Sequence, residues 1–142
     1  MRRVLDASVI VKWLLRDPER EGQSAEARSL MQAVAAGEVE VLQPPHWLAE
    51  VAAVMARLSP GTLATDITDL YALDFEVAGS LAIYQRATDL AVKLNQHVFD
   101  TLYHAVALES ADCTLVTADL RYLRTAREQG RIVGLEHWRQ SA

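Results

Sequence analysis

The chain has 142 residues, of which 51% are hydrophobic and 23% are charged, and its formal net charge is −5. This length and composition are typical of one folded domain and exclude a disordered polypeptide. The negative charge also excludes nucleic-acid binding driven by bulk electrostatics alone, so any such binding must depend on local geometry.

The N-terminal segment and the single cysteine indicate a cytoplasmic protein. Two arginines and an apolar run open the chain, but Asp6 and Lys12 interrupt that run, and no small-residue cleavage pattern follows as in a signal peptide. We find no stretch that is long and apolar enough to span a membrane. Cys113 stands alone in an apolar run, which indicates a buried thiol rather than a disulfide framework or a thiolate metal cluster.

The hydrophobic pattern predicts strands that alternate with helices along the whole chain. Short apolar and β-branched runs predict strands at 2–6, 39–43, 113–117 and 131–135, with a further short strand within 74–79. Helices are expected at 9–16 (capped by Ser8), 25–36, 46–58, 62–73, 80–95, 100–108 and 119–130. This alternation predicts an α/β fold with a mainly parallel central sheet of about four to five strands flanked by helices, in one domain over residues 1–142.

Four acids fall where strands of such a sheet end or where helices follow them. Asp6 and Asp119 come after predicted strands, Asp100 begins a predicted helix, and Glu50 lies in the helix that follows residues 39–43. Ligands of open α/β sheets bind outside the carboxyl ends of the strands, so these four side chains can converge there. Each aspartate also has a simpler interpretation as a helix cap or a turn residue.

Glu50 is harder to explain by structure alone. It lies among apolar residues on a helix that is expected to be buried, and no lysine or arginine stands three or four residues away. If the four carboxylates converge, each pair repels by about 3 kcal/mol at a separation of about 5 Å and an effective dielectric constant near 20. A hard divalent cation removes this repulsion, and oxygen ligands favour Mg²⁺ or Mn²⁺.

The histidines offer a rival metal site. His97, Asp100 and His104 recur at helical spacing, and two imidazoles with a carboxylate suit zinc or iron. However, His97 precedes the expected helix start and no third strong ligand lies nearby. His104 is therefore interpreted as a packing or hydrogen-bonding residue, and the sequence gives no role to His46.

The motifs, taken in order, resemble those of a PIN-domain ribonuclease of the VapC type, the toxin of a bacterial type II toxin–antitoxin pair. They are "VLDASVIVKWLL", "PPHWLAEVAAVMARL", "VFDTLYHAVAL" and "TLVTADLRYL". The resemblance implies that four residues are catalytic and bind Mg²⁺ or Mn²⁺: Asp6, Glu50, Asp100 and Asp119. It also implies supporting roles for Ser8 and Thr117. Many relatives carry asparagine where this chain has Ala53, which puts one supporting hydrogen bond in doubt.

The same resemblance implies a metal-dependent endoribonuclease that hydrolyses RNA phosphodiester bonds with metal-activated water. A cognate VapB-type antitoxin would cover the acidic cleft, and a homodimer is expected through the apolar helices 46–58 and 62–73. Basic residues near the acids are expected to hold RNA phosphates, although each has an equally good interpretation as part of a solvated helix face: Lys12, Arg16, Arg121 and Arg124.

Two other functions stay open at this point. One is a nuclease-inactive interaction module that keeps the fold, which the presence of all four acids disfavours. The other is a small-molecule phosphohydrolase, which the absence of a glycine-rich phosphate loop and of a nucleophilic "DxD" motif disfavours.

Overall fold

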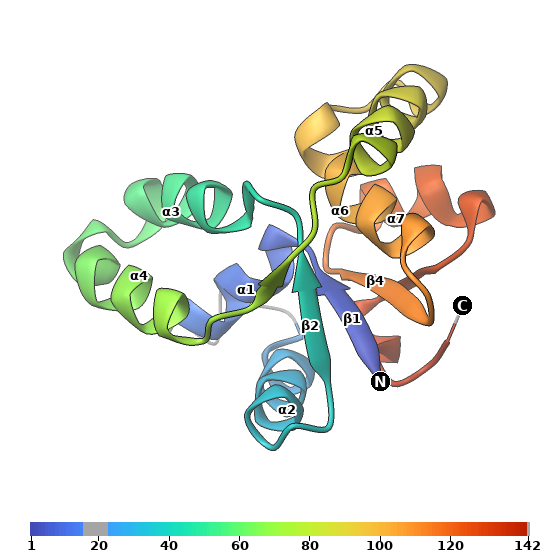
Figure 1. Cartoon of the computed structure of the whole chain (residues 1–142). Helices are drawn as coiled ribbons and strands as arrows, with labels where there is room; N and C mark the ends of the chain where they lie inside the picture. Colours follow the sequence, from blue (N-terminus) through green and yellow to red (C-terminus); the bar gives the residue numbers. More distant parts are fainter. Residues whose placement is uncertain (16–22, 142) are drawn as a thin grey trace.

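Five parallel strands form the central sheet in the computed structural model, which describes residues 1–15 and 23–141 (Figure 1). In chain order they are β1 (Arg2–Leu5), β2 (Glu40–Gln43), β3 (Glu76–Val77), β4 (Cys113–Thr117) and β5 (Ile132–Gly134). Their order across the sheet is β3-β2-β1-β4-β5, which puts β1 in the centre. The predicted α/β fold with a parallel sheet of about four to five strands flanked by helices is confirmed.

Helices cover the sheet and extend beyond it. They are α1 (Ala7–Leu14), α2 (Ser24–Ala35), α3 (Trp47–Leu58), α4 (Leu63–Ala72), α5 (Leu81–Leu94), α6 (Val98–Glu109) and α7 (Leu120–Ala126). Helix α6 lies on β1, β2 and β4, and α5 packs on α6. The connection from β1 to β2 and the connection from β3 to β4 run in opposite directions across the sheet. Because crossover connections between parallel strands are right-handed, these two connections cover opposite faces of the sheet. Helices α3 and α4 form a pair at one side of the molecule (Figure 1).

The α6 helix and the central strands are buried because both faces of the sheet are covered. Tyr103 and His104 of α6 are fully buried, as are Leu5 of β1 and Leu115 of β4. Parallel strands with two covered faces are typically continuous apolar runs, as "CTLVT" is here. Cys113 begins that run and is a buried free thiol, as expected. Among the described residues, no helix has the length and hydropathy needed to cross a membrane.

The chain leaves β1 and β4 toward different faces of the sheet, so a crevice opens between their carboxyl ends. The backbone N–H of Asp6, directly after β1, donates to the carbonyl of Val116 in β4 over 3.0 Å. This bond fixes the start of α1 beside the end of β4. Residues from both ends of the sequence therefore meet at this edge.

Two helices begin at residues other than those expected. Asp6, and not Ser8, caps α1: its carboxylate accepts a hydrogen bond from the backbone N–H of Ser8. Helix α6 has His97 at its N-cap, which places Asp100 in the first turn and not at the start. Asp119 does cap α7, where it accepts from the N–H of Tyr122. Capping by an earlier residue frees the Asp100 carboxylate for another role.

Gln43 completes the pairing of β1 with β2 where the main-chain ladder ends. The Leu5 N–H donates to the Gln43 side-chain oxygen, and the Gln43 amide donates to the Leu5 carbonyl, each over 2.9 Å. Gln43 is fully buried, so no water can replace these bonds. The glutamine thus holds the residue directly before Asp6.

We predict that Gln43→Leu lowers the free energy of unfolding by about 3 kcal/mol, since it leaves the buried N–H and carbonyl of Leu5 without partners. Urea denaturation measures this loss. Gln85→Leu, on the exposed surface of α5, is the matched control and should change stability little. Equal stability of the two variants would contradict the role given to Gln43.

Candidate metal centre

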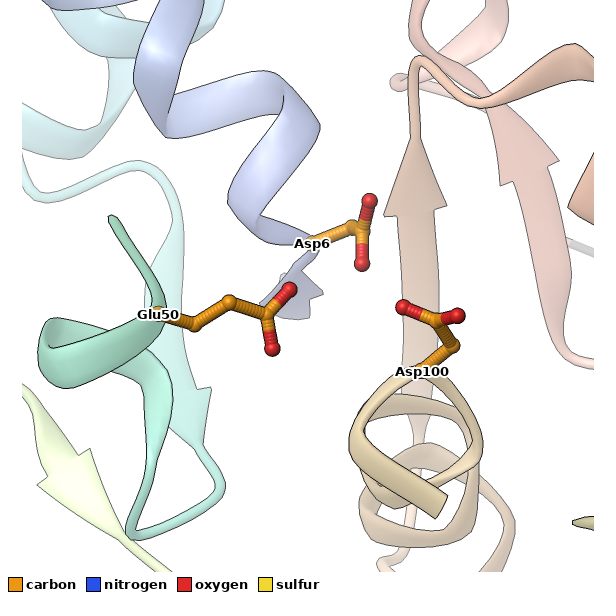
Figure 2. A group of neighbouring side chains, drawn as sticks. All are labelled: Asp6, Glu50 and Asp100. Carbon is orange, nitrogen blue, oxygen red and sulfur yellow. The ribbon is translucent and has the colours of Figure 1, made fainter. Parts of the chain in front are cut away.

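Three carboxylates from distant segments converge beside the carboxyl end of β1. Asp6 follows β1, Glu50 lies on α3 and Asp100 lies on α6, and all three point into one common space (Figure 2). One oxygen from each lies within 4.8 Å of the others. The fold therefore brings together three of the four acids that the sequence singled out.

Neutral hydrogen-bond donors hold the Asp6 carboxylate in place. Its Oδ2 atom accepts from the Ser8 N–H over 3.3 Å, from the Ser8 hydroxyl, and from the Thr117 hydroxyl over 3.3 Å. The Ser8 hydroxyl also accepts from the N–H of Ala118 over 3.0 Å, which ties it to the end of β4. Each of these bonds to Asp6 within the described part of the chain falls on Oδ2 and not on Oδ1.

Glu50 is accompanied by His46, one helical turn before it. The two atoms His46 Nε2 and Glu50 Oε2 are 3.0 Å apart. The same nitrogen lies 2.8 Å from the Phe99 carbonyl, and with its proton on Nε2 the ring donates to that carbonyl. Glu50 Oε2 is buried, and within residues 1–15 and 23–141 it forms no hydrogen bond of good geometry and has only the His46 ring beside it. A buried carboxylate oxygen in this state favours a positively charged ligand.

Burial and the charges of neighbouring acids disfavour the charged forms of Asp6 and Asp100. Burial, together with the charges of Glu50 and Asp100, raises the pKa of Asp6 to about 6, although the Ser8 hydrogen bonds oppose the shift. The pKa of Asp100 is raised by burial and then by Glu50 and Asp119. Asp100 nevertheless lies in the first turn of α6, where the positive end of the helix dipole favours a negative charge.

The donor set and its spacing fit a hard divalent cation. Carboxylate oxygens are the ligands that Mg²⁺ and Mn²⁺ prefer, and ligands on opposite sides of Mg²⁺ lie about 4 Å apart. The three oxygens, within 4.8 Å of one another, need only a small adjustment to contact one ion. The buried Oε2 atom of Glu50, which has only the His46 ring beside it among the described residues, would gain a charged ligand.

The structure places Asp119 next to this cluster and not within it. Its carboxylate caps α7, and its charge acts on Asp100. Asp119 and Asp100 line the same polar pocket of about 470 Å³, together with Arg121 and His97. The Thr117 hydroxyl, which donates to Asp6, accepts from the N–H of Asp119 over 3.0 Å. Asp119 is thus coupled to the cluster through one side chain and a shared pocket.

The basic residues that the sequence analysis selected are differently placed. Arg121 is exposed and lines the polar pocket, whereas Arg124 is exposed on α7 and is not part of the pocket lining. Lys12 lies in the last turn of α1. Arg16 falls outside the described residues. Arg121 is therefore the described cation of this set that lines a pocket together with Asp100 and Asp119.

The rival site at His97, Asp100 and His104 does not form among the described residues. Both nitrogens of the buried His104 ring have partners: Nδ1 lies 3.1 Å from the Tyr122 hydroxyl, and Nε2 lies 2.8 Å from the Gly130 carbonyl. Burial lowers the pKa of this histidine, which keeps the ring neutral. His104 is a hydrogen-bonding residue of the core, as interpreted from the sequence.

Sequence reasoning missed two residues at the cluster. His46 received no role, although its spacing of four residues before Glu50 was a visible signal of a contact. Tyr103 is fully buried, its hydroxyl has no partner among the described residues, and its ring centroid lies 4.8 Å from that of His46. Burial and the three nearby acids raise the pKa of the Tyr103 hydroxyl, so it stays protonated.

The sequence was then compared with models of protein families. The model of the PIN domain matches residues 3–128, which include all the acids described above. The chain belongs to the PIN domain family. The resemblance drawn from the motifs is thereby confirmed at the level of the family.

Comparison with solved structures shows the same fold. One chain of the crystal structure of VapBC2 from Rickettsia felis, bound to a DNA fragment from their promoter, superposes with a TM-score of 0.63 and 14% sequence identity. The match covers 94% of this chain and 98% of that chain. At such low identity the likeness concerns the fold alone. No curated protein matches the sequence.

The raised pKa of Asp6 predicts a specific pH dependence of stability without metal. The folded state holds the Asp6 proton more tightly than the unfolded state, whose pKa is near 3.8, so stability falls as the pH rises from about 4 to about 6. In chelator at pH 7.5, Asp6→Asn should raise the free energy of unfolding by up to about 3 kcal/mol, as a shift of about two pKa units implies.

Denaturation curves at several pH values measure this effect. Asp69→Asn, exposed on α4, is the matched control and should follow the wild type. Addition of Mg²⁺ should stabilise the wild type and the control much more than Asp6→Asn. An Asp6→Asn protein that is less stable than the wild type in chelator would contradict the electrostatic account.

Proposed function

We propose that the protein is an endoribonuclease that depends on Mg²⁺ or Mn²⁺ and acts as the VapC-type toxin of a type II toxin–antitoxin pair. The observation that carries this proposal is the convergence of Asp6, Glu50 and Asp100 within 4.8 Å, with a buried Glu50 oxygen that has only the His46 ring beside it among the described residues. A PIN domain with such a cluster is suited to metal-assisted hydrolysis of a phosphodiester. Asp6, Glu50 and Asp100 would hold the cation.

Each residue of the site has a part in the proposed reaction. When bound, the cation supplies positive charge for the phosphoryl transition state and makes water more acidic. Ser8 and Thr117 keep the Asp6 carboxylate oriented by donating to one of its oxygens. His46 fixes the first turn of α3 against α6 through the Phe99 carbonyl, which aligns Glu50 with Asp100. Asp119 extends the acidic surface toward α7 and completes the set of four catalytic acids.

The polar pocket beside α7 is suited to the sugar–phosphate backbone of RNA. Arg121 lines it together with Asp100 and Asp119, and a guanidinium there can bind a phosphate while the acids bind the cation. Lys12 and Arg124 are further candidates for phosphate binding, as is Arg16, which falls outside the described residues. Local positive charge of this kind compensates for the net charge of −5.

The proposed partners are a VapB-type antitoxin and a second copy of the chain, in the cytoplasm. The structural neighbour is a VapBC2 complex bound to promoter DNA, which supports an antitoxin partner for this chain. Leu58, Tyr71 and Leu73 are exposed at the ends of α3 and α4, which supports a homodimer contact through that helix pair. The unit that acts is taken to be one domain over residues 1–142.

We predict that the purified protein cleaves RNA in Mg²⁺ or Mn²⁺ and that chelator abolishes cleavage. Asp100→Asn should lower the cleavage rate at least a hundredfold, because the cation loses a charged ligand. Gel electrophoresis of total RNA measures both effects. The control is Asp69→Asn, which should cleave as fast as the wild type. Cleavage that survives both chelation and Asp100→Asn would refute the proposal, and cleavage of nucleoside monophosphates alone would make the protein a small-molecule phosphohydrolase.

The same assay tests the cation in the polar pocket. Arg121→Glu should slow RNA cleavage about tenfold or more without a change in stability, since Arg121 is exposed. Arg28→Glu on α2 makes the same change of charge at an exposed position outside the pocket. If both variants slow cleavage equally, Arg121 acts only through net charge and has no place in the substrate site.

A further inference from the structure

A second pocket adjoins the acidic cluster on the side of α3. It has a volume of about 420 Å³, and Glu50 and Asp100 form part of its wall. Ala49, Ala53 and Phe99 form the apolar part of the wall, and His46 and His97 complete the lining. Because Ala49 and Ala53 are one helical turn apart and carry only methyl groups, α3 leaves the space open.

Two of the rings in this pocket, Phe99 and His46, stack on each other, and His46 also contacts a third ring outside the lining. The Phe99 ring stacks on His46, with centroids 5.5 Å apart and an interplanar angle of 29°, and His46 in turn contacts the buried ring of Tyr103. The hydrogen bond between the Phe99 carbonyl and His46 holds the backbone of Phe99 in register with this stack. Phe99 is nevertheless 65% exposed. A rigidly positioned, exposed aromatic ring is an available stacking surface.

The neighbours of the Phe99 ring restrict what can occupy the pocket. An occupant must offer a flat or apolar group to Phe99 and the two alanines while it tolerates the carboxylates of Glu50 and Asp100 a few ångströms away. A nucleobase joined to a phosphate satisfies both demands, because the base can stack and the phosphate can reach a cation held by the acids. An apolar peptide side chain satisfies only the first demand.

We propose that this pocket binds the nucleobase next to the scissile phosphate of a single-stranded RNA, stacked on Phe99. The inference rests on the proposed ribonuclease function and names a subsite of it. His97 and Asp100 line both this pocket and the polar pocket beside α7, so the two pockets flank the acidic cluster. One side thus receives a base and the other receives the sugar–phosphate backbone.

The chemistry of the wall also defines the selectivity of this subsite. Stacking accepts every base because each has an aromatic face, so Phe99 distinguishes single-stranded from duplex RNA, in which the base is already stacked, rather than one base from another. Any selection among bases would come from the polar side chains of the lining, which are His46, Glu50, His97 and Asp100.

The test is the affinity of short RNAs with and without bases. Fluorescence anisotropy is measured with a labelled single-stranded hexanucleotide and with an abasic hexamer of equal length and charge, in Ca²⁺ in place of Mg²⁺. Phe99→Leu should weaken binding of the normal hexamer about tenfold and leave binding of the abasic hexamer unchanged. Phe99→Tyr should retain the affinity of the wild type.

Two further variants separate stacking from general effects. Ala53→Met places a long side chain in the pocket from an exposed position and should weaken binding of the normal hexamer as Phe99→Leu does. Tyr84→Leu replaces a partly exposed aromatic ring on α5, outside the pocket lining, and should bind both hexamers as the wild type does.

The outcomes distinguish this inference from the proposed function. If Phe99→Leu weakened the binding of both hexamers equally, the base subsite would be overturned. Unchanged binding of the normal hexamer would also overturn it, and an apolar side chain of a protein partner would then be the occupant. Either result with normal Mg²⁺-dependent cleavage of total RNA overturns the subsite alone. A loss confined to the normal hexamer in a protein that cleaves no RNA would instead overturn the ribonuclease function and leave a base-binding site.

Discussion

The structure is organised around a repulsion that the polypeptide alone does not remove. Carboxylate oxygens of Asp6, Glu50 and Asp100 lie within 4.8 Å of one another, and each charged pair costs about 3 kcal/mol at such distances and an effective dielectric constant near 20. Burial and then this repulsion raise the pKa of Asp6 to about 6, and the buried Glu50 oxygen has only the His46 ring beside it among the described residues. A divalent cation removes both costs at once, so the fold is arranged for a ligand and not for its own stability.

The fold can hold this cluster because rigid elements position each acid. Gln43 closes the β1–β2 ladder at Leu5, and the backbone of Asp6 is bonded to β4, so the first carboxylate emerges from the centre of the sheet. Ser8 and Thr117 donate to Asp6 as neutral groups, which orient its charge without cancelling it. Neutral support of this kind keeps the site attractive to a cation, whereas a lysine or arginine in the same place would compete with it.

The sequence was sufficient for the fold class and for three converging acids, because both follow from local patterns. Apolar runs that alternate with helical periods predict a parallel sheet, and acids after its strands fall at one edge. The roles of Gln43 and Tyr103 were not predictable, since each depends on contacts between distant segments. Asp119 lies beside the three-acid cluster, where its Oδ1 atom caps α7 and its charge acts on Asp100, and its role as a metal ligand stays a prediction. The contact between His46 and Glu50 could have been predicted from their spacing of four residues on one helix. It was missed because the sequence analysis gave His46 no role.

A crystal structure grown in Mn²⁺ tests the central claim most directly, because anomalous scattering locates the ion independently of the protein phases. The account predicts an anomalous peak in contact with oxygens of Asp6, Glu50 and Asp100, with the buried Oε2 of Glu50 among the ligands or bonded to a water of the ion. The absence of Mn²⁺ from these three carboxylates at saturating concentration, or its presence at another cluster only, would contradict the account.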